Sequence, residues 1–520
     1  MKFIKPKRSK PPKPTTSIGS AEDRIFKYFI SYAILVTYVL ASISSTTDLM
    51  LLQSTDGMKL PFVDSRVSIR GFFIAAPLVV AAASLFMARE FHALSIQKGK
   101  SPQGTGFIFS VSDLKSDRKI FGVEGKLDAI AIRFFSYCIF FLIGPVVILI
   151  SLIRFADYQD KLLFSFHLIL FVGTTYLSWI YYRRVENLFS RNQTPRFMVP
   201  IGIFATFVIG LKLLICFDVI FAPSKYSLTM YLRQHTNWLN NSDGGIVSIV
   251  PHLSIDRASS IWRPDTKDYS EIAVYSHNKN ARDYFYSRVA GIDLRGRNLK
   301  YLDISFQIAP RIWAHDADLS GANLSFTRIP GSNFINTNLY GVNFSMSVVD
   351  GSRFFAGTME TAQIANSYFR GAVFDSMNIS HVFLRNVNFT GASFFGVKIQ
   401  ESVLDGVNFS GSNFFETKLT DNSMIIDDPS PIFPHSPSTK NEFGEFSGAF
   451  LEDEEAALSA IAKQFCGNTL SASDEIALQG ITTIFALTDG IKADRMLKLQ
   501  KKLNELSCDK ALEFVPTEKY

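Results

Sequence analysis

Residues 317–344 read ADLSGANLSFTRIPGSNFINTNLYGVNF, and this stretch decides the fold of the second half of the chain. A large apolar residue stands at every fifth position, and the register continues without a slip from Leu319 to Met424. A β-strand alternates with a period of two and an amphipathic helix with a period of 3.6, so neither regular structure explains five. We expect a coil that turns a corner once in every five residues and carries one large and one small side chain inward.

A square coil of this kind has four corners, so the pattern predicts that residues four repeats apart stack above one another. The large positions do separate into columns of one chemical type, of which one is entirely aliphatic and another entirely aromatic. Coils about 4.8 Å apart allow aromatic rings to stack. The aromatic column is the predicted core column of the coil and consists of Phe334, Phe354, Phe374, Phe394 and Phe414.

The A(D/N)LXX pattern of this stretch resembles the pentapeptide-repeat proteins, whose fold is a right-handed quadrilateral β-helix. The resemblance implies such a β-helix over residues 291–425, with its register carried back to Leu294. Pro310 and Trp313 interrupt the pattern near the start. We therefore expect the first coils to be irregular.

The first half of the chain predicts membrane helices. Of the 520 residues, 47% are hydrophobic and only 19% are charged, which indicates that part of the chain is not in water. Buried helices of a soluble core are the alternative, but the stretch FFSYCIFFLIGPVVILISLI offers no polar face. Five apolar stretches approach the roughly 20 residues of a spanning helix, at 26–44, 71–88, 133–153, 162–182 and 197–217.

The first stretch has a second interpretation as a signal peptide, because Val39 and Ala41 imitate a small-residue cleavage site. The long basic region before it favours a retained helix. Residues 1–24 contain seven Lys and Arg residues, the second loop contains eight and the fourth loop four. The first and third loops contain only three and two. Five spans then put the N-terminus in the cytoplasm and everything after residue 217 outside, whereas four spans would reverse that placement.

The membrane half adds to the resemblance. KLPFVDSRVSIRGFFIAAPL at 59–78 and LRGRNL at 294–299 look like a bacterial pentapeptide-repeat subgroup with N-terminal transmembrane helices. This resemblance implies a multi-pass protein of the bacterial inner membrane, and the loop charges with five spans predict that its repeat domain is periplasmic. The expected organisation is a basic N-terminus (1–24), a transmembrane region (25–221), a linker or capping region (222–290), the β-helix (291–425), a Pro/Ser-rich linker (426–450) and a small helical domain (451–520).

Signatures of catalysis are missing from the sequence. It contains no P-loop, GxSxG elbow, HExxH motif or paired CxxC, so we expect no catalytic residue, no cofactor and no metal. The best-known soluble members of the family imitate DNA with an acidic rod and inhibit DNA gyrase. Residues 291–424 carry eleven acidic and ten basic residues, which makes a poor mimic of a duplex, and we expect no nucleic-acid partner.

Four outward positions of the repeats predict an interaction stripe: Ile335, Phe355, Phe395 and Phe415, with Asp375 between them. A partner protein and the chain's own tail, through Phe433, Phe443 or Phe446, are equally good candidates to cover it.

Two polar residues fall inside the apolar stretches, Lys212 and His167. Such residues suggest a functional role by default, although snorkelling and packing explain them as well. In the tail, Cys466 and Cys508 are candidates for a disulfide, with two reduced core thiols as the alternative.

A rigid repeat surface without catalytic residues favours a non-enzymatic, membrane-anchored scaffold for protein–protein interaction at the cell envelope. Lys212 and His167 motivate the alternative, an accessory component of a transport, channel or envelope-sensing system. The expected partners are the lipid bilayer and an unidentified protein, and a homo-oligomer is left open.

Overall fold

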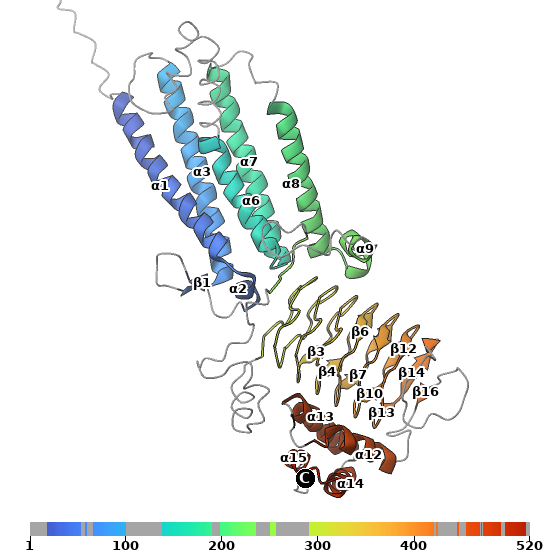
Figure 1. Ribbon diagram of the computed structural model, residues 1–520. Helices are drawn as coiled ribbons and strands as arrows, with labels where there is room; N and C mark the ends of the chain where they lie inside the picture. Colours follow the sequence, from blue (N-terminus) through green and yellow to red (C-terminus); the bar gives the residue numbers. More distant parts are fainter. Residues whose placement is uncertain are drawn as a thin grey trace, which may run out of the picture. The chain divides into compact units, whose positions relative to one another are not determined.

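The computed structural model describes most of the chain in two compact units. The first comprises Met1–Thr46, Gly57–Phe155 and Leu162–Ile209, and the second comprises Thr47–Asp56, Ala156–Lys161 and Gly210–Tyr520. Figure 1 shows α-helices in the first part of the chain, and a coil of short strands followed by helices in the second. The described residues are 18–53, 58–59, 66–99, 138–189, 198–235, 250–255, 291–420, 423–424, 445–446, 454–467, 470, 472–489 and 494–515.

Long apolar helices dominate the first unit. The helices are α1 (Ile18–Ser45), α3 (Ile69–Gly99), α6 (Ile143–Ala156), which follows the π-helix η1 (Cys138–Leu142), α7 (Lys161–Phe189) and α8 (Met198–Phe221). From Gly210 onward, α8 belongs to the second unit. Four segments are long and apolar enough to cross a membrane, namely Arg24–Ser45, Ile69–Ile96, Cys138–Ala156 and Lys161–Val185. Side chains of α8 are described only from Thr206 onward, so the fifth span stays a prediction.

Aromatic side chains pack these helices together. Phe91 of α3 stacks on Phe140 of η1 with 4.3 Å between ring centroids, and Phe73 lies 4.7 Å from Phe155. Large apolar side chains such as Leu162 and Ile169 are exposed on the outside of α7. Exposed apolar residues in such numbers suit a lipid environment and suggest a membrane protein.

A β-helix forms most of the second unit, and its coils repeat every 20 residues. Phe394 pairs in parallel with Phe374 on one side and with Phe414 on the other. We call the side of the coil that carries this column the phenylalanine face. Its strands are β3 (Asn333–Ile335), β4 (Arg353–Phe355), β7 (Val373–Asp375), β10 (Ser393–Phe395) and β13 (Asn413–Phe415).

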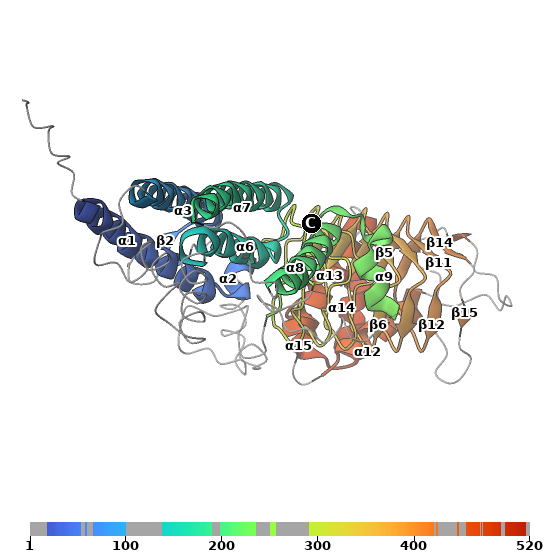
Figure 2. The same cartoon turned by 90° about the horizontal axis from the view of Figure 1, so that it is seen from above.

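The next two sides of the coil are also parallel sheets. The aliphatic face comprises β5 (Thr358–Glu360), β8 (Asn378–Ser380), β11 (Lys398–Gln400) and β14 (Thr417–Thr420), to which β16 (Glu445–Phe446) adds antiparallel. The third face comprises β6 (Gln363–Ala365), β9 (Phe383–Arg385), β12 (Val403–Asp405) and β15 (Ser423–Met424). The fourth is joined by isolated bridges such as Asn388 to Asn408. Figure 2 shows these strands side by side along the coil.

Each corner of the coil uses the left-handed backbone conformation. Every fifth residue from Gly296 to Glu416 has a positive φ, between 49° and 66°. L-residues adopt this region only at a cost, which Gly does not pay. The apolar residue two positions earlier is buried in each repeat, and it is large everywhere except at Ala309 and Ala314. Each repeat of five residues therefore supplies one buried side chain and one corner.

The first coils are regular, and the expectation that they would be irregular was wrong. The bridge from Asp293 to Trp313 continues the same register, and Arg311 occupies an ordinary left-handed corner. Proline lacks a backbone donor. The ladder nevertheless continues, because the N–H of Ala309 donates to Arg328 at 2.9 Å and that of Arg311 donates to Pro330 at 3.0 Å, on either side of Pro310.

The tail forms helices that pack on one corner of the β-helix. They are α12 (Glu454–Phe465), α13 (Ala472–Asp489), α14 (Asp494–Glu505) and α15 (Asp509–Leu512). A Cβ added to Gly371 would collide with the backbone carbonyl of Ala477, and one added to Gly391 would lie 2.5 Å from Ile481. A column of glycines at one corner therefore lets α13 approach the backbone of the coil.

Candidate interaction surfaces

The core column makes the β-helix a rod with a stacked aromatic interior. Phe334, Phe354, Phe374, Phe394 and Phe414 are all buried. Their neighbouring ring centroids lie 4.8 to 5.0 Å apart, with the planes within 8° of parallel. Any bend of the rod would separate these rings, so the core supports a stiff surface.

The predicted stripe runs along the outside of the phenylalanine face. Phe355 is 45% exposed, while Ile335 and Phe395 are half-buried. Phe415 lies in β13, and its side chain is outside the described residues. Asp375 interrupts the stripe and accepts a hydrogen bond from Ser376 at 2.8 Å. Among the stripe residues whose side chains are described, Phe355 is thus the most exposed.

The tail was a candidate cover for this stripe. Its described contacts lie elsewhere, because α13 packs on the glycine corner and Phe446 of β16 pairs with Thr417 of β14. Phe433 and Phe443 lie outside the described residues.

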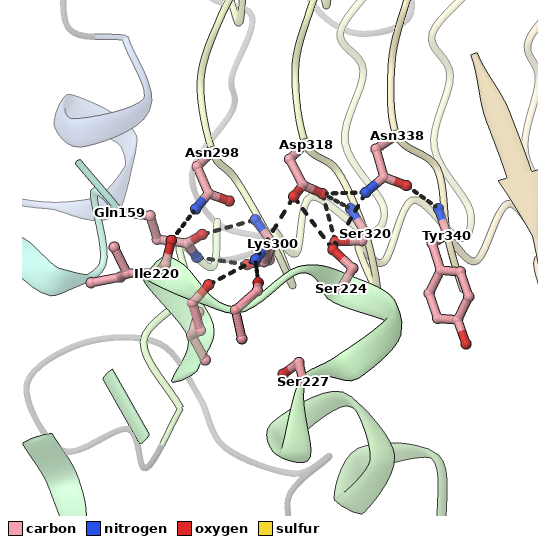
Figure 3. Close-up of polar contacts among 12 residues, drawn as sticks. Gln159, Ile220, Ser224, Ser227, Asn298, Lys300, Asp318, Ser320, Asn338 and Tyr340 are labelled. Atoms are coloured by element: carbon pink, nitrogen blue, oxygen red, sulfur yellow. Dashed lines mark hydrogen bonds and ion pairs between the residues drawn. The ribbon is translucent and has the colours of Figure 1, made fainter. Parts of the chain in front are cut away.

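A second surface joins the β-helix to the end of α8, and we call it the junction. Lys300, buried on the first coil, donates from Nζ to the carbonyls of Val219 at 3.0 Å and Ala222 at 2.6 Å. Asn298 Nδ2 donates to the carbonyl of Ile220 at 3.3 Å (Figure 3). The last carbonyls of a helix lack partners within it and carry partial negative charge, which a cation stabilises. Lys300 therefore caps α8.

Asp318 balances the charge of Lys300. Its Oδ2 lies 3.8 Å from Lys300 Nζ, and its Oδ1 accepts a hydrogen bond from Asn338 Nδ2 at 3.0 Å. Ser224 Oγ shares a 2.6 Å hydrogen bond with Ser320 Oγ (Figure 3). Burial lowers the pKa of Lys300 below its ordinary value, and the Asp318 carboxylate opposes that change. The network spans three successive coils.

Two further segments, which connect long apolar helices in the sequence, contact the same coil. Gln159 donates from Nε2 to the carbonyl of Lys300 at 2.7 Å and accepts from its N–H at 3.0 Å, as a backbone strand would. Arg297 donates to the carbonyls of Leu51 at 3.1 Å and Leu52 at 2.6 Å, at the end of α2 (Asp48–Leu52). Its guanidinium also lies 4.5 Å from the ring centroid of Tyr158. Arg297, Asn298 and Lys300 thus hold three separate segments.

Sequence reasoning missed the junction. The signal that could have found it is the unusual basic content of RGRNLK, residues 295–300, at positions where later coils carry mostly neutral residues.

An ion cluster fixes the tail. Arg370 donates to the fully buried Asp350 carboxylate, with Nη2 2.6 Å from Oδ2, and from Nη1 to Asp474 Oδ1 at 2.5 Å. Asp474 lies in the first turn of α13.

Cys466 and Cys508 form a disulfide with Cα atoms 4.9 Å apart, which joins the end of α12 to the start of α15. The disulfide therefore links helices within the tail, whereas the ion cluster holds the tail on the corner.

The two polar residues predicted within the apolar stretches belong to different units. His167 is buried in the first unit, with Nδ1 2.7 Å from the carbonyl of Leu163 and its ring stacked near Phe155. Lys212 is half-buried on α8, in the second unit. Among the described residues, no group of three or more His, Cys, Asp and Glu could hold a metal ion.

Comparisons with known proteins match the β-helix. The family model for pentapeptide repeats matches eight copies within residues 317–354 and 367–401. No curated protein sequence matches the chain.

Among solved structures, the chain is similar to HetL, a pentapeptide-repeat protein involved in heterocyst differentiation regulation from the cyanobacterium Nostoc. The identity is 19% over 27% of this chain and 74% of HetL, with a TM-score of 0.24. It is also similar to a pentapeptide-repeat protein of the Arabidopsis thaliana thylakoid lumen, with 27% identity over 21% of this chain and 70% of that one and a TM-score of 0.15. It is also similar to QnrB1, a plasmid-mediated fluoroquinolone resistance protein, with 14% identity over 26% of this chain and 85% of QnrB1 and a TM-score of 0.11.

Proposed function

We propose that this pentapeptide-repeat protein is a non-enzymatic scaffold, anchored in a bacterial inner membrane and presenting its β-helix to a protein partner in the cell envelope. The observation that carries the proposal is the exposed Phe355 on a rod whose aromatic core is stacked and whose tail packs on another corner. A stiff rod with an apolar patch fits binding better than catalysis, since exposed apolar patches mark contact surfaces.

The junction supports a placement of the β-helix on one side of the membrane. Residues 47–56 follow α1, residues 156–161 connect α6 to α7, and both segments contact the same coil as the end of α8. Segments on one side of a membrane are separated by an even number of crossings. The helices α3 and α6 supply two crossings, so α7 and α8 have to supply the next two. This reasoning favours α8 as the fifth span.

Five spans, taken together with the loop charges, predict the side of the membrane on which the β-helix lies. The loops that contact the β-helix are the two that are poor in Lys and Arg, and such loops lie outside the cytoplasm. The repeat domain is then periplasmic, and the N-terminus is cytoplasmic.

Complementation of a deletion strain tests the proposed function against the transport alternative. One variant carries Phe355→Ser with Phe395→Ser, and the other carries Lys212→Leu. The scaffold requires that the first variant fails to restore the phenotype while Lys212→Leu restores it. If only Lys212→Leu loses complementation, that result would contradict the scaffold proposal and favour a role in transport. Equal membrane abundance of both variants, measured by immunoblot, is the control.

A further inference from the structure

A short amphipathic helix follows α8 almost directly. The 3₁₀ turn η2 (Ser224–Tyr226) and the helix α9 (Leu228–His235) begin within a few residues of the end of α8 at Phe221. Asp218, in the last turn of α8, accepts hydrogen bonds from the N–H groups of Leu228 at 3.2 Å and Thr229 at 2.8 Å. Since these N–H groups lack partners within α9, Asp218 caps it and fixes it to the end of α8.

One face of this segment packs on the β-helix. Ser227, Thr229 and Met230 are buried, and Met230 clusters with Val219 and Tyr301. Further along the coil, Lys225 pairs with Glu360 at 3.6 Å. Figures 1 and 2 agree that α9 lies beside the strands of the β-helix.

The opposite face presents large apolar side chains to the surroundings. Tyr226 is 81% exposed, Leu228 63% and Tyr231 58%. Tyrosine is enriched where one end of a side chain is apolar and the other is wet, as at the boundary of a bilayer. A helix with one apolar face and one polar face lies in the plane of that boundary.

From this geometry we infer that η2 and α9 form an interfacial anchor that binds the surface of the lipid bilayer through Tyr226, Leu228 and Tyr231. The inference rests on the fifth span of the proposed function. If α8 crosses the membrane, its end lies at the boundary, and the cap from Asp218 starts α9 there. Because the other face of the segment packs on the first coils, the anchor also holds the β-helix beside the membrane.

Site-specific photocrosslinking of the full-length protein in its membrane tests the anchor. A diazirine amino acid replaces Tyr226, Leu228 or, as the control, Phe355 on the phenylalanine face, which is also exposed. After irradiation, mass spectrometry identifies the adducts. We expect phospholipid adducts at Tyr226 and Leu228, at least about tenfold above those at Phe355.

Two results would overturn the inference. One is capture of a protein without lipid at Tyr226 and Leu228, which would make this face a protein-binding surface. The other is a lipid yield no higher than that at Phe355. Neither result affects whether Phe355 captures a protein, so failure of the anchor and failure of the scaffold remain distinguishable.

Discussion

The ammonium group of Lys300 donates a hydrogen bond of 3.0 Å to the backbone carbonyl of Val219, 81 positions earlier in the chain. The bond ties the first coil of the β-helix to the last turn of α8. A buried ammonium group is costly unless it is paired, and here two carbonyls and Asp318 surround it. Lys300 therefore stabilises the contact between the first coil and the end of α8.

Replacing Lys300 by methionine should loosen the junction. The change leaves the carbonyls of Val219 and Ala222 without their donor and Asp318 without its cation, at a cost of about 2–4 kcal/mol. Hydrogen exchange of residues 219–235 in detergent should rise. Lys398→Met, an exposed change on the aliphatic face, is the control and should leave that exchange unchanged. Equal exchange in both variants would contradict the role of Lys300.

The core column should dominate the stability of the rod. Phe374→Ala removes a ring that stacks on both Phe354 and Phe394, and we expect a loss of about 3–5 kcal/mol. Phe355→Ala, on the outside of the same face, should cost no more than about 0.5 kcal/mol. Denaturant unfolding of the purified protein, followed by circular dichroism, measures both. Similar losses in the two variants would be inconsistent with an inward column.

Two glycines on different corners of the coil offer a matched pair of substitutions. Gly371 and Gly396 have φ values of 61° and 58°, so alanine costs about 1 kcal/mol at either site for the backbone alone. Only at Gly371 would the new Cβ collide with Ala477, whereas at Gly396 its nearest neighbour is Ser376 Oγ at 3.9 Å. Gly371→Ala should therefore release the tail to limited proteolysis, and Gly396→Ala should not. Equal cleavage would place α13 elsewhere.

The period of five was sufficient to predict the β-helix. The reason is physical, since each repeat buries one side chain and makes one corner, and the register of Phe334 and Phe354 follows directly. The tail position was harder to predict. Gly371 is already explained by its left-handed corner, and only the packed structure reveals the second reason, the approach of Ala477.

The junction could not be predicted from periodicity. Lys300 and Gln159 are 141 positions apart, and no repeat relates them. Polar contacts of this kind depend on where the connecting segments end in space. The first coils show a related limit. Pro310 has no backbone N–H, and the sequence does not reveal that the hydrogen-bond ladder there uses the N–H groups of its neighbours Ala309 and Arg311.

The disulfide provides a test of the compartment. In cells, Cys466 and Cys508 should resist a bulky maleimide until a reductant is added, because disulfides persist outside the cytoplasm. The assay uses a Cys138→Ser, Cys216→Ser background, in which no other cysteine reacts. Labelling of both thiols without reduction would indicate a reducing compartment and argue against the periplasmic placement.

Photocrosslinking from Phe355 in living cells tests the central claim most directly. A diazirine amino acid at Phe355 should capture one defined protein, while the same probe at Gln363, an exposed residue on the third face, should not. Capture of one protein at Phe355 and not at Gln363 is the result that a scaffold predicts. Identical adducts at both positions, or no protein at either, would contradict it.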